Sequence, residues 1–315
     1  MKHWIEAARV RTLPLSVSGI IVGSMYALAY PTAHVLTPTE VFNWYLFGFA
    51  LLTTLLLQVL SNFANDYGDG IKGTDNEERI GPKRAIQSGV ITPAAMKKAI
   101  IITAVLTFIS AVLLIYYAFG YQHFWYSLLF LILGILAIAS AIRYTVGNTA
   151  YGYRGYGDVF VFVFFGLVST IGVNFLYSKE LDFKLFLPAI AIGFLSVAVL
   201  NLNNMRDVIS DTKAGKNTLV VKMGIQNAKK YHYFLVISAM LLVLLFAVLK
   251  EFAIDQYFFV VAYFPLTSHL LTVKRNTDSR TLDPELKKVA ISTFLLSLLL
   301  SLCMIYFLSD IVVNN

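Results

Sequence analysis

Long runs of apolar residues, each about the length of a membrane-spanning helix, alternate along the chain with short segments rich in charged and amide side chains. A helix needs about 20 mostly apolar residues to cross roughly 30 Å of hydrocarbon. We therefore expect an all-α, polytopic membrane bundle that forms a single domain over residues 1–315. The runs predict nine spanning helices, at 13–30, 42–61, 99–118, 124–142, 158–177, 185–203, 233–249, 255–273 and 289–308.

The composition supports a membrane protein. Apolar residues make up 58% of the chain and charged residues only 14%, against roughly 45–50% and about 25% in soluble domains. A soluble globule would have too few charges to cover its surface, so a cytosolic enzyme, a nucleic-acid-binding protein and a disordered chain are excluded. One cysteine, Cys303, excludes an internal disulfide, and five histidines without ligand spacing predict no zinc or haem site.

The basic residues are distributed very unevenly between the two sides of the predicted membrane. If the N-terminus lies inside, 22 of the 25 lysines and arginines fall on inside segments, leaving Lys179, Lys184 and Lys250 outside. This asymmetry predicts a multi-pass protein of the bacterial plasma (inner) membrane with its N-terminus in the cytoplasm. The net charge of +7 then reflects the membrane topology, so we expect no nucleic-acid partner. We expect the protein to be surrounded by the lipid bilayer and to need no protein partner.

Two inside loops, after the second and sixth spans, carry the residues that indicate chemistry. If the second span continues for one or two turns, Asn62, Asp66 and Asp69 share one helical face at i, i+4 and i+7. After the sixth span, residues 203, 207 and 211 repeat this stacking with one asparagine and two aspartates. Four spans separate the two motifs, which suggests two similar halves that face each other around a central cavity.

Clustered carboxylates repel one another unless a cation lies between them, and an open site with oxygen ligands alone favours Mg²⁺. Basic side chains near these acids would complete a site for a polyphosphate group. The candidate metal ligands are Asn65, Asp66, Asp69, Asn203, Asp207 and Asp211. The basic residues of the two loops are Lys72, Arg79, Lys83, Arg84, Lys213 and Lys216.

The two acidic motifs resemble those of the UbiA-type membrane prenyltransferases, and the resemblance covers nearly the whole chain. It is strongest to the branch that prenylates 1,4-dihydroxy-2-naphthoate in menaquinone synthesis. One departure is that the acid expected four residues after Asp69 is replaced by Gly73, and the next acid is Asp75. The stretches that carry the resemblance are Arg11-Thr12-Leu13-Pro14, Asn65-Asp66-Tyr67-Gly68-Asp69, Arg79-Ile80-Gly81-Pro82, Gly155-x-Gly157-Asp158, Asn203-Asn204-Met205-Arg206-Asp207 and Lys216-Asn217-Thr218-Leu219.

The resemblance implies that Mg²⁺ joins the aspartates to the diphosphate of a polyprenyl donor, and that a polyprenyl group passes to 1,4-dihydroxy-2-naphthoate. Carbon dioxide and diphosphate would leave, giving demethylmenaquinone. We expect catalytic roles for Asp69, Asp207, Asp211 and Lys72. Diphosphate would be bound by Arg79, Lys83, Arg84, Lys213 and Lys216, and the acceptor by Tyr144 and an arginine, the candidates being Arg11, Arg143 and Arg154.

Two alternatives remain open from the sequence. The first is a member of the same family that uses another aromatic acceptor, such as 4-hydroxybenzoate or homogentisate. The second is a secondary transporter with acidic residues along an ion path. Transporters place such acids near the bilayer midplane on interrupted helices, whereas here the acids follow the ends of spans and lie beside basic residues.

Overall fold

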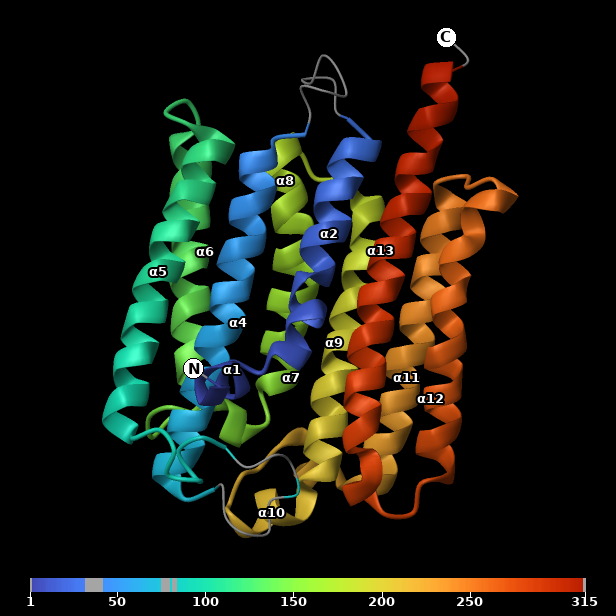
Figure 1. Cartoon of the computed structure of the whole chain (residues 1–315). Coiled ribbons are helices and arrows are strands. Elements are labelled where there is room, and N and C mark those ends of the chain that lie inside the picture. The colour runs from blue at the N-terminus through green and yellow to red at the C-terminus, as the bar shows by residue number, and fades with distance from the viewer. Residues whose placement is uncertain (1, 32–41, 75–79, 81–83, 314–315) are drawn as a thin grey trace.

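The computed structural model describes residues 2–31, 42–74, 80 and 84–313, and within them the chain is helical with no strand. Long, roughly parallel helices run between two ends of the molecule (Figure 1). Seven of them are long and apolar enough to span a membrane, or eight if the bent pair α1 and α2 counts as one span. The nine predicted ranges fall almost entirely on helix, so the predicted helical bundle is confirmed. The predicted number of nine spans is approximate.

The first half of the chain supplies the helices that surround most of the cavity described below. They begin and end at the positions that their sequences indicate: Asn43 and Thr92 cap the starts of α4 and α5, and Gly73 ends α4 with a positive φ of 68°. These helices are α1 (Lys2–Ala8), α2 (Leu13–Ala29), α4 (Trp44–Lys72), α5 (Pro93–Phe119), α6 (Phe124–Arg143), α7 (Gly157–Val161), the π-helical stretch η3 (Phe162–Gly172) and α8 (Val173–Ser178).

The second half supplies the densest part of the core. In the most apolar stretch of Phe183–Arg206, which contains α9, 72% of the residues are buried inside the protein. In the corresponding stretch of α6 the share is 0%, so α9 is a central helix and α6 a peripheral one. The elements of this half are α9 (Phe186–Arg206), α10 (Val208–Lys213), α11 (Leu219–Leu249), η5 (Ile254–Ala262), α12 (Tyr263–Arg275) and α13 (Asp283–Val313).

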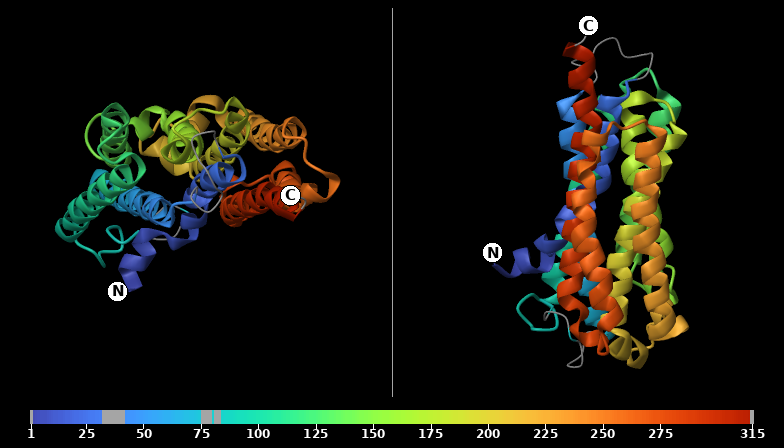
Figure 2. Two further views of the ribbon diagram at one scale, coloured as in Figure 1. Left: turned by 90° about the horizontal axis from the view of Figure 1, so that it is seen from above. Right: turned by 90° about the vertical axis from the view of Figure 1, so that its right-hand side faces the viewer.

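The helices form two facing rows. Seen from above, α4, α2 and α13 make one row, and α6, η3, α9 and α11 make the row opposite (Figure 2). Glycines let the rows approach closely at one place: a Cβ atom on Gly23 of α2 would lie 2.2 Å from the carbonyl oxygen of Thr170 in η3. On the other side of η3, a Cβ on Gly166 would lie 2.7 Å from the Cα of Gly193 in α9. Any larger residue would force these helices apart.

A buried polar chain joins α11, α12 and α13. The Nε2 atoms of His232 and His269 are 2.7 Å apart, and His269 Nδ1 lies 2.5 Å from Glu285 Oε2. Lys288 donates to the second oxygen of Glu285 at 2.7 Å. Two histidines that look scattered in the sequence therefore meet as hydrogen-bond partners between helices. Within the described ranges they do not belong to a group that could hold a metal ion.

Candidate active site

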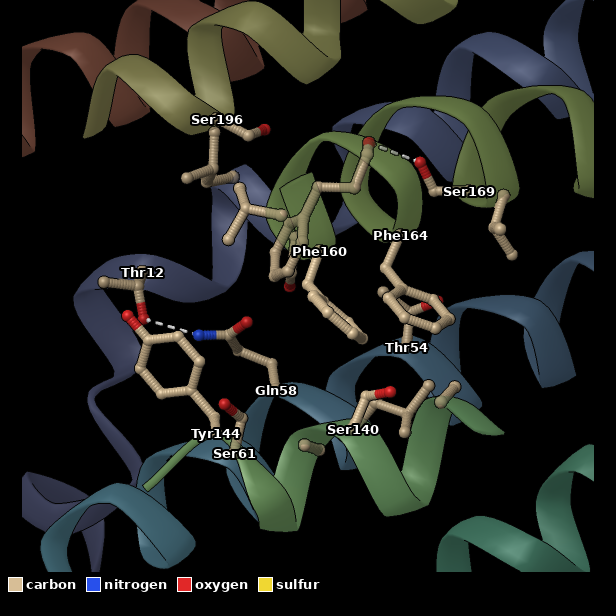
Figure 3. Close-up of a pocket in the computed structure, with 18 of the residues that line it drawn as sticks. Thr12, Thr54, Gln58, Ser61, Ser140, Tyr144, Phe160, Phe164, Ser169 and Ser196 are labelled. Atoms are coloured by element: carbon tan, nitrogen blue, oxygen red, sulfur yellow. Dashed lines mark hydrogen bonds between the residues drawn. The ribbon is translucent and has the colours of Figure 1, made fainter. Parts of the chain in front are cut away.

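A cavity of about 370 Å³ lies between the two rows of helices and is lined from both of them. One end is polar and charged, and the other end, toward α5 and α8, is apolar (Figure 3 shows its middle part). Such a gradient suits a ligand with an anionic head and a hydrocarbon tail. The charged end is lined by Arg9, Asn65, Asp69, Arg84, Asn203 and Lys216, and the apolar end by Ile20, Leu114, Phe130, Val173 and Leu176.

Asp69 is the best enclosed carboxylate of the charged end, with 2% of its surface exposed. One of its oxygens, Oδ2, lies 2.8 Å from Arg84 Nη1 and 3.8 Å from Lys216 Nζ. Its other oxygen, Oδ1, accepts a hydrogen bond of 2.7 Å from the Tyr153 hydroxyl. Three partners from three different segments therefore converge on this one side chain. The arrangement is possible because α4 continues eleven residues beyond the predicted span and carries Asp69 to the cavity.

Lys72, one turn after Asp69, acts on Tyr153. Its ammonium lies 4.1 Å from the centre of the Tyr153 ring and donates to the carbonyl oxygens of Thr145 and Gly147 at 2.8 and 2.9 Å. The Tyr153 hydroxyl also lies 2.6 Å from Thr74 Oγ1. These contacts hold the tyrosine in place to donate to Asp69, so in this arrangement Lys72 is a positioning residue.

The second acidic motif is organised by an arginine within it. Arg206, with 1% of its surface exposed, donates to both oxygens of Asp207 at 2.8 and 2.6 Å and to Asn203 Oδ1 at 2.8 Å. It also pairs with Asp283 at the start of α13. A buried guanidinium whose three nitrogen atoms all donate to side-chain oxygens fixes the end of α9 against α13.

Asp211, on α10, shares the Lys216 ammonium with Asp69. The chain breaks its helix at Asp207, yet the amide of Asp207 donates to the carbonyl of Asn203 and the amide of Asp211 to that of Asp207, so the three residues keep the predicted one-turn spacing. Asp211 Oδ1 lies 3.8 Å from Lys216 Nζ. Burial raises the pKa of the Asp211 carboxyl to about 6, with Lys216 opposing and the charges of Asp207 and Asp69 adding to the rise.

These three carboxylates, here called the acidic cluster (Asp69, Asp207 and Asp211), are close enough to repel one another, and the Lys216 ammonium lies between two of them. In the described part of the chain, no three acidic, histidine or cysteine side chains approach as a complete metal-binding group. Oxygen donors on one side of an open space nevertheless fit Mg²⁺, which commonly takes one or two carboxylates and completes its shell with water and substrate phosphate. The residues present therefore fit a magnesium–diphosphate group.

The chain matches the model of the UbiA prenyltransferase family over residues 25–299, which include the acidic cluster and every helix that lines the apolar end of the cavity except most of α2. This chain belongs to that family. It is accordingly an integral membrane protein with the fold of a UbiA-type enzyme.

Two relatives match almost from end to end. The 1,4-dihydroxy-2-naphthoate octaprenyltransferase of Haemophilus influenzae is 43% identical over 302 residues, which are 96% of this chain and 95% of that protein. The enzyme with the same name from Escherichia coli K12 is 43% identical over 296 residues, covering 94% and 92% of the two chains. The sequence resemblance to the naphthoate branch of the UbiA family is thereby confirmed.

Solved structures support the fold. A UbiA homolog from Aeropyrum pernix K1 superimposes with a TM-score of 0.63 at 13% identity, covering 95% of this chain and 99% of the other. A UbiA homolog from Archaeoglobus fulgidus, solved with DMAPP and Mg²⁺, gives a TM-score of 0.61 at 14% identity and the same coverage. At these identities the likeness establishes the architecture of this UbiA family member.

The structure brings most of the predicted metal and diphosphate residues together. Asp69, Asp211, Arg84 and Lys216 form one connected group. Arg206 ties Asn203 to Asp207, and the amide of Asp211 donates to the carbonyl of Asp207. Asn65 lines the cavity, and its Oδ1 accepts from the Thr145 hydroxyl at 3.2 Å. Two predicted residues, Arg79 and Lys83, lie outside the described residues, as does the side chain of Arg11.

Asp66 lies apart from the acidic cluster. Its two oxygens accept from the backbone amides of Ala85 and Ile86 at 3.0 and 3.2 Å, and 2% of its surface is exposed. A carboxylate bound in this way anchors the loop after α4 and presents no oxygen to the cavity. Asp66 does not line the cavity in this structure, and its role as a metal ligand stays a prediction.

The predicted acceptor residues are divided by the structure. Tyr144 lines the cavity, whereas Arg143 and Arg154 are exposed and do not line it. Lys213 is likewise exposed at the end of α10 and does not line the cavity. These three basic side chains lie at the surface of the charged end, where arginine and lysine are common in any membrane protein.

Four residues of the site were not predicted: Arg9, Gln58, Tyr153 and Arg206. Arg206 stands inside the motif Asn203–Asp207, but neighbours in a helix normally point in different directions and are not read as partners. Tyr153 lies in the short helical turn Tyr151–Arg154 between α6 and α7, where nothing in the local sequence marks it as a partner of Asp69. Arg9 and Gln58 line the cavity from α2's entry turn and from the middle of α4, and nothing in their local sequence marks them.

Proposed function

We propose that this protein transfers a polyprenyl group from a polyprenyl diphosphate to 1,4-dihydroxy-2-naphthoate, with loss of carbon dioxide and diphosphate, to give demethylmenaquinol, the reduced form of demethylmenaquinone. The observation that carries the proposal is a buried acidic cluster whose Asp69 lines the charged end of a mainly apolar cavity together with Arg84 and Lys216. The names of the two relatives at 43% identity support the choice of acceptor.

The residues divide the work between the leaving group and the carbon chain. Asn65, Asp69, Asn203, Asp207 and Asp211 would hold Mg²⁺, which when bound makes diphosphate a better leaving group. Arg84 and Lys216 are placed to neutralise the charge that develops on the departing diphosphate. The apolar end of the cavity receives the prenyl tail and excludes water from the reacting carbon.

An aromatic wall lies beside the position where the allylic carbon would become electron-poor. Tyr151 and Phe160 stack with ring centroids 3.9 Å apart, and Tyr144 meets Tyr151 edge to face at 5.3 Å. All three line the cavity. The faces of such rings stabilise positive charge through their quadrupoles.

The decisive experiment is a direct product assay. Purified protein would be incubated with Mg²⁺, a polyprenyl diphosphate and a panel of aromatic acids, and the products identified by mass. We expect a decarboxylated, prenylated product from 1,4-dihydroxy-2-naphthoate that disappears when EDTA replaces Mg²⁺. Turnover of 4-hydroxybenzoate or homogentisate with none of the naphthoate would overturn the assignment in favour of another aromatic acceptor.

We further propose that the bundle spans a bacterial plasma membrane with its charged end on the cytoplasmic side. The support is the placement of 22 of the 25 basic residues on segments at the same predicted side. A cysteine placed at Lys213, in protein whose Cys303 is replaced by Ala, should be protected from an impermeant thiol reagent in intact cells. A cysteine at Lys179 should react, and the opposite pattern would invert the orientation.

A further inference from the structure

One side chain in the middle of the cavity has a hydrogen-bonding need that the protein does not meet. Gln58 lies on the face of α4 that also carries Ser61, Asn65 and Asp69 toward the cavity. Its oxygen Oε1 is screened from solvent and has no hydrogen-bond partner among the described residues. Leaving a buried carbonyl oxygen without a hydrogen bond costs free energy, and such unpaired groups are rare in folded proteins.

The contacts of Thr12 determine which end of the Gln58 amide is the oxygen. The Thr12 hydroxyl has a single hydrogen, and it donates that hydrogen to the carbonyl oxygen of Arg9 at 2.9 Å. Toward Gln58 it can therefore only accept, and Gln58 Nε2 donates to it at 3.4 Å. Figure 3 shows this contact and the rest of the amide directed into the space below Phe160 and Phe164. The long bond leaves the amide free to adjust when a ligand enters.

An acceptor oxygen in this position selects for a ligand group that donates a hydrogen. Carboxylate and diphosphate oxygens carry no such hydrogen at neutral pH, and a prenyl chain has no polar hydrogen at all. A phenolic hydroxyl has one. Gln58 is eleven residues before Asp69, which on an α-helix is about 16 Å, so a ligand that reaches Gln58 extends from the acidic cluster toward the aromatic wall.

We propose that Gln58 Oε1 accepts a hydrogen bond from the 4-hydroxyl of the aromatic acceptor and thereby selects dihydroxy over monohydroxy substrates; this inference rests on the function proposed above. The 1-hydroxyl of the naphthoate is ortho to the carboxylate, bonds to it internally and activates the adjacent carbon. The 4-hydroxyl is remote from the carboxylate and from the reacting carbon. It is therefore the hydroxyl that remains for recognition by the protein.

The test compares two acceptors, 1,4-dihydroxy-2-naphthoate and its 4-methoxy analogue, which keeps the 1-hydroxyl and the carboxylate but cannot donate from the 4-position. We expect wild-type protein to prefer the dihydroxy compound about tenfold in kcat/KM, since a hydrogen bond of ordinary strength is worth about a factor of ten. Gln58→Leu should raise the KM for the dihydroxy acceptor about tenfold, reduce the preference to near unity and leave the KM for the polyprenyl diphosphate unchanged.

Thr54→Val is the matched control, because Thr54 lines the same cavity one turn earlier on α4. It should keep the tenfold preference. Gln58→Glu, which retains an acceptor oxygen at nearly the same volume, provides a second variant if Gln58→Leu does not fold, and it should also keep the preference for the dihydroxy compound.

The inference is overturned if wild-type protein does not discriminate between the two acceptors, or if Gln58→Leu retains the preference. It is also overturned if Gln58→Leu raises the KM for both acceptors equally. That result is expected if Gln58 binds a water molecule or only supports the helix. Failure of the proposed function looks different, because wild-type protein would then form no product from either naphthoate.

Discussion

The two acidic helix ends differ in where the partners of their carboxylates come from. Asp69 is held by Arg84, Lys216 and Tyr153, which lie in three segments remote from one another in the sequence. Asp207 is held by Arg206, the residue directly before it, which is itself tied to Asp283. Asp69 can therefore exchange its partners when loops and ligands move. Asp207 is fixed as part of the packing of α9 against α13.

The largest effect that this comparison predicts is on stability. Arg206→Gln should lower the free energy of unfolding by about 3–5 kcal/mol, because Asp207 would be left as an uncompensated buried charge. Thermal unfolding in detergent would measure it. Arg280→Gln, which breaks an exposed pair with Asp278, is the control and should leave stability almost unchanged. Equal effects of the two changes would remove the structural distinction drawn for Asp207.

The next effect is on turnover. Asp69→Asn and Asp207→Asn keep volume and each remove one negative charge, so each should reduce turnover about a hundredfold or more if the metal supplies several kcal/mol of leaving-group stabilisation. Raised Mg²⁺ should partly restore the single variants. The double variant should be scarcely worse than either, since both residues serve one site.

Asp207→Asn should in addition lower the melting temperature more than Asp69→Asn does, which would sharpen the contrast between the two ends. If both variants purify as folded protein and turn over within a few fold of wild type, the metal site is refuted.

A smaller loss of turnover is expected when the Tyr153 hydroxyl, which donates to Asp69, is removed. Tyr153→Phe removes a hydrogen bond to a charged group, worth about 1.5 kcal/mol or more, so turnover should fall about tenfold. Tyr156→Phe, at an exposed tyrosine in the same loop, should have no effect. Unchanged turnover in Tyr153→Phe would mean that Arg84 and Lys216 alone hold Asp69.

The smallest effect is predicted for Lys72. It reaches the site through the face of the Tyr153 ring, a contact worth about 0.5–1 kcal/mol, so Lys72→Gln should cost a few fold in turnover. A loss as large as that of Asp69→Asn would instead support the catalytic role that the sequence resemblance implies for Lys72. Kinetics at varied concentrations of the polyprenyl diphosphate distinguish the two cases.

The sequence predicts the bundle well because a spanning helix is specified by a local run of apolar residues. The same local pattern predicts that α4 continues past residue 61, since Asn62, Asp66 and Asp69 follow helical spacing. It cannot predict which of these acids faces the cavity. That depends on the loop at Ala85 and Ile86, which takes Asp66 away from the cluster by donating two backbone amides.

The basic partners are less predictable than the acids for the same reason. Arg84 and Lys216 reach Asp69 across the fold. Other basic residues at the same end of the molecule are exposed at the surface, namely Arg143, Arg154 and Lys213. Gln58 offers no sequence signal, because a single amide in an apolar run is usually an ordinary contact between helices. Only the cavity and the hydrogen bonds of Thr12 reveal that its oxygen lacks a partner.

The orientation of Tyr151 bears on how long such a protein can work without damaging itself. Its hydroxyl donates to the carbonyl of Ser140 at 2.9 Å, so the ring faces the cavity while the phenol oxygen is held against α6. An electron-poor allylic group is an alkylating agent, and an exposed phenol oxygen beside it would itself be alkylated. By offering its ring face and withholding its nucleophilic oxygen, Tyr151 avoids alkylation over many reaction cycles.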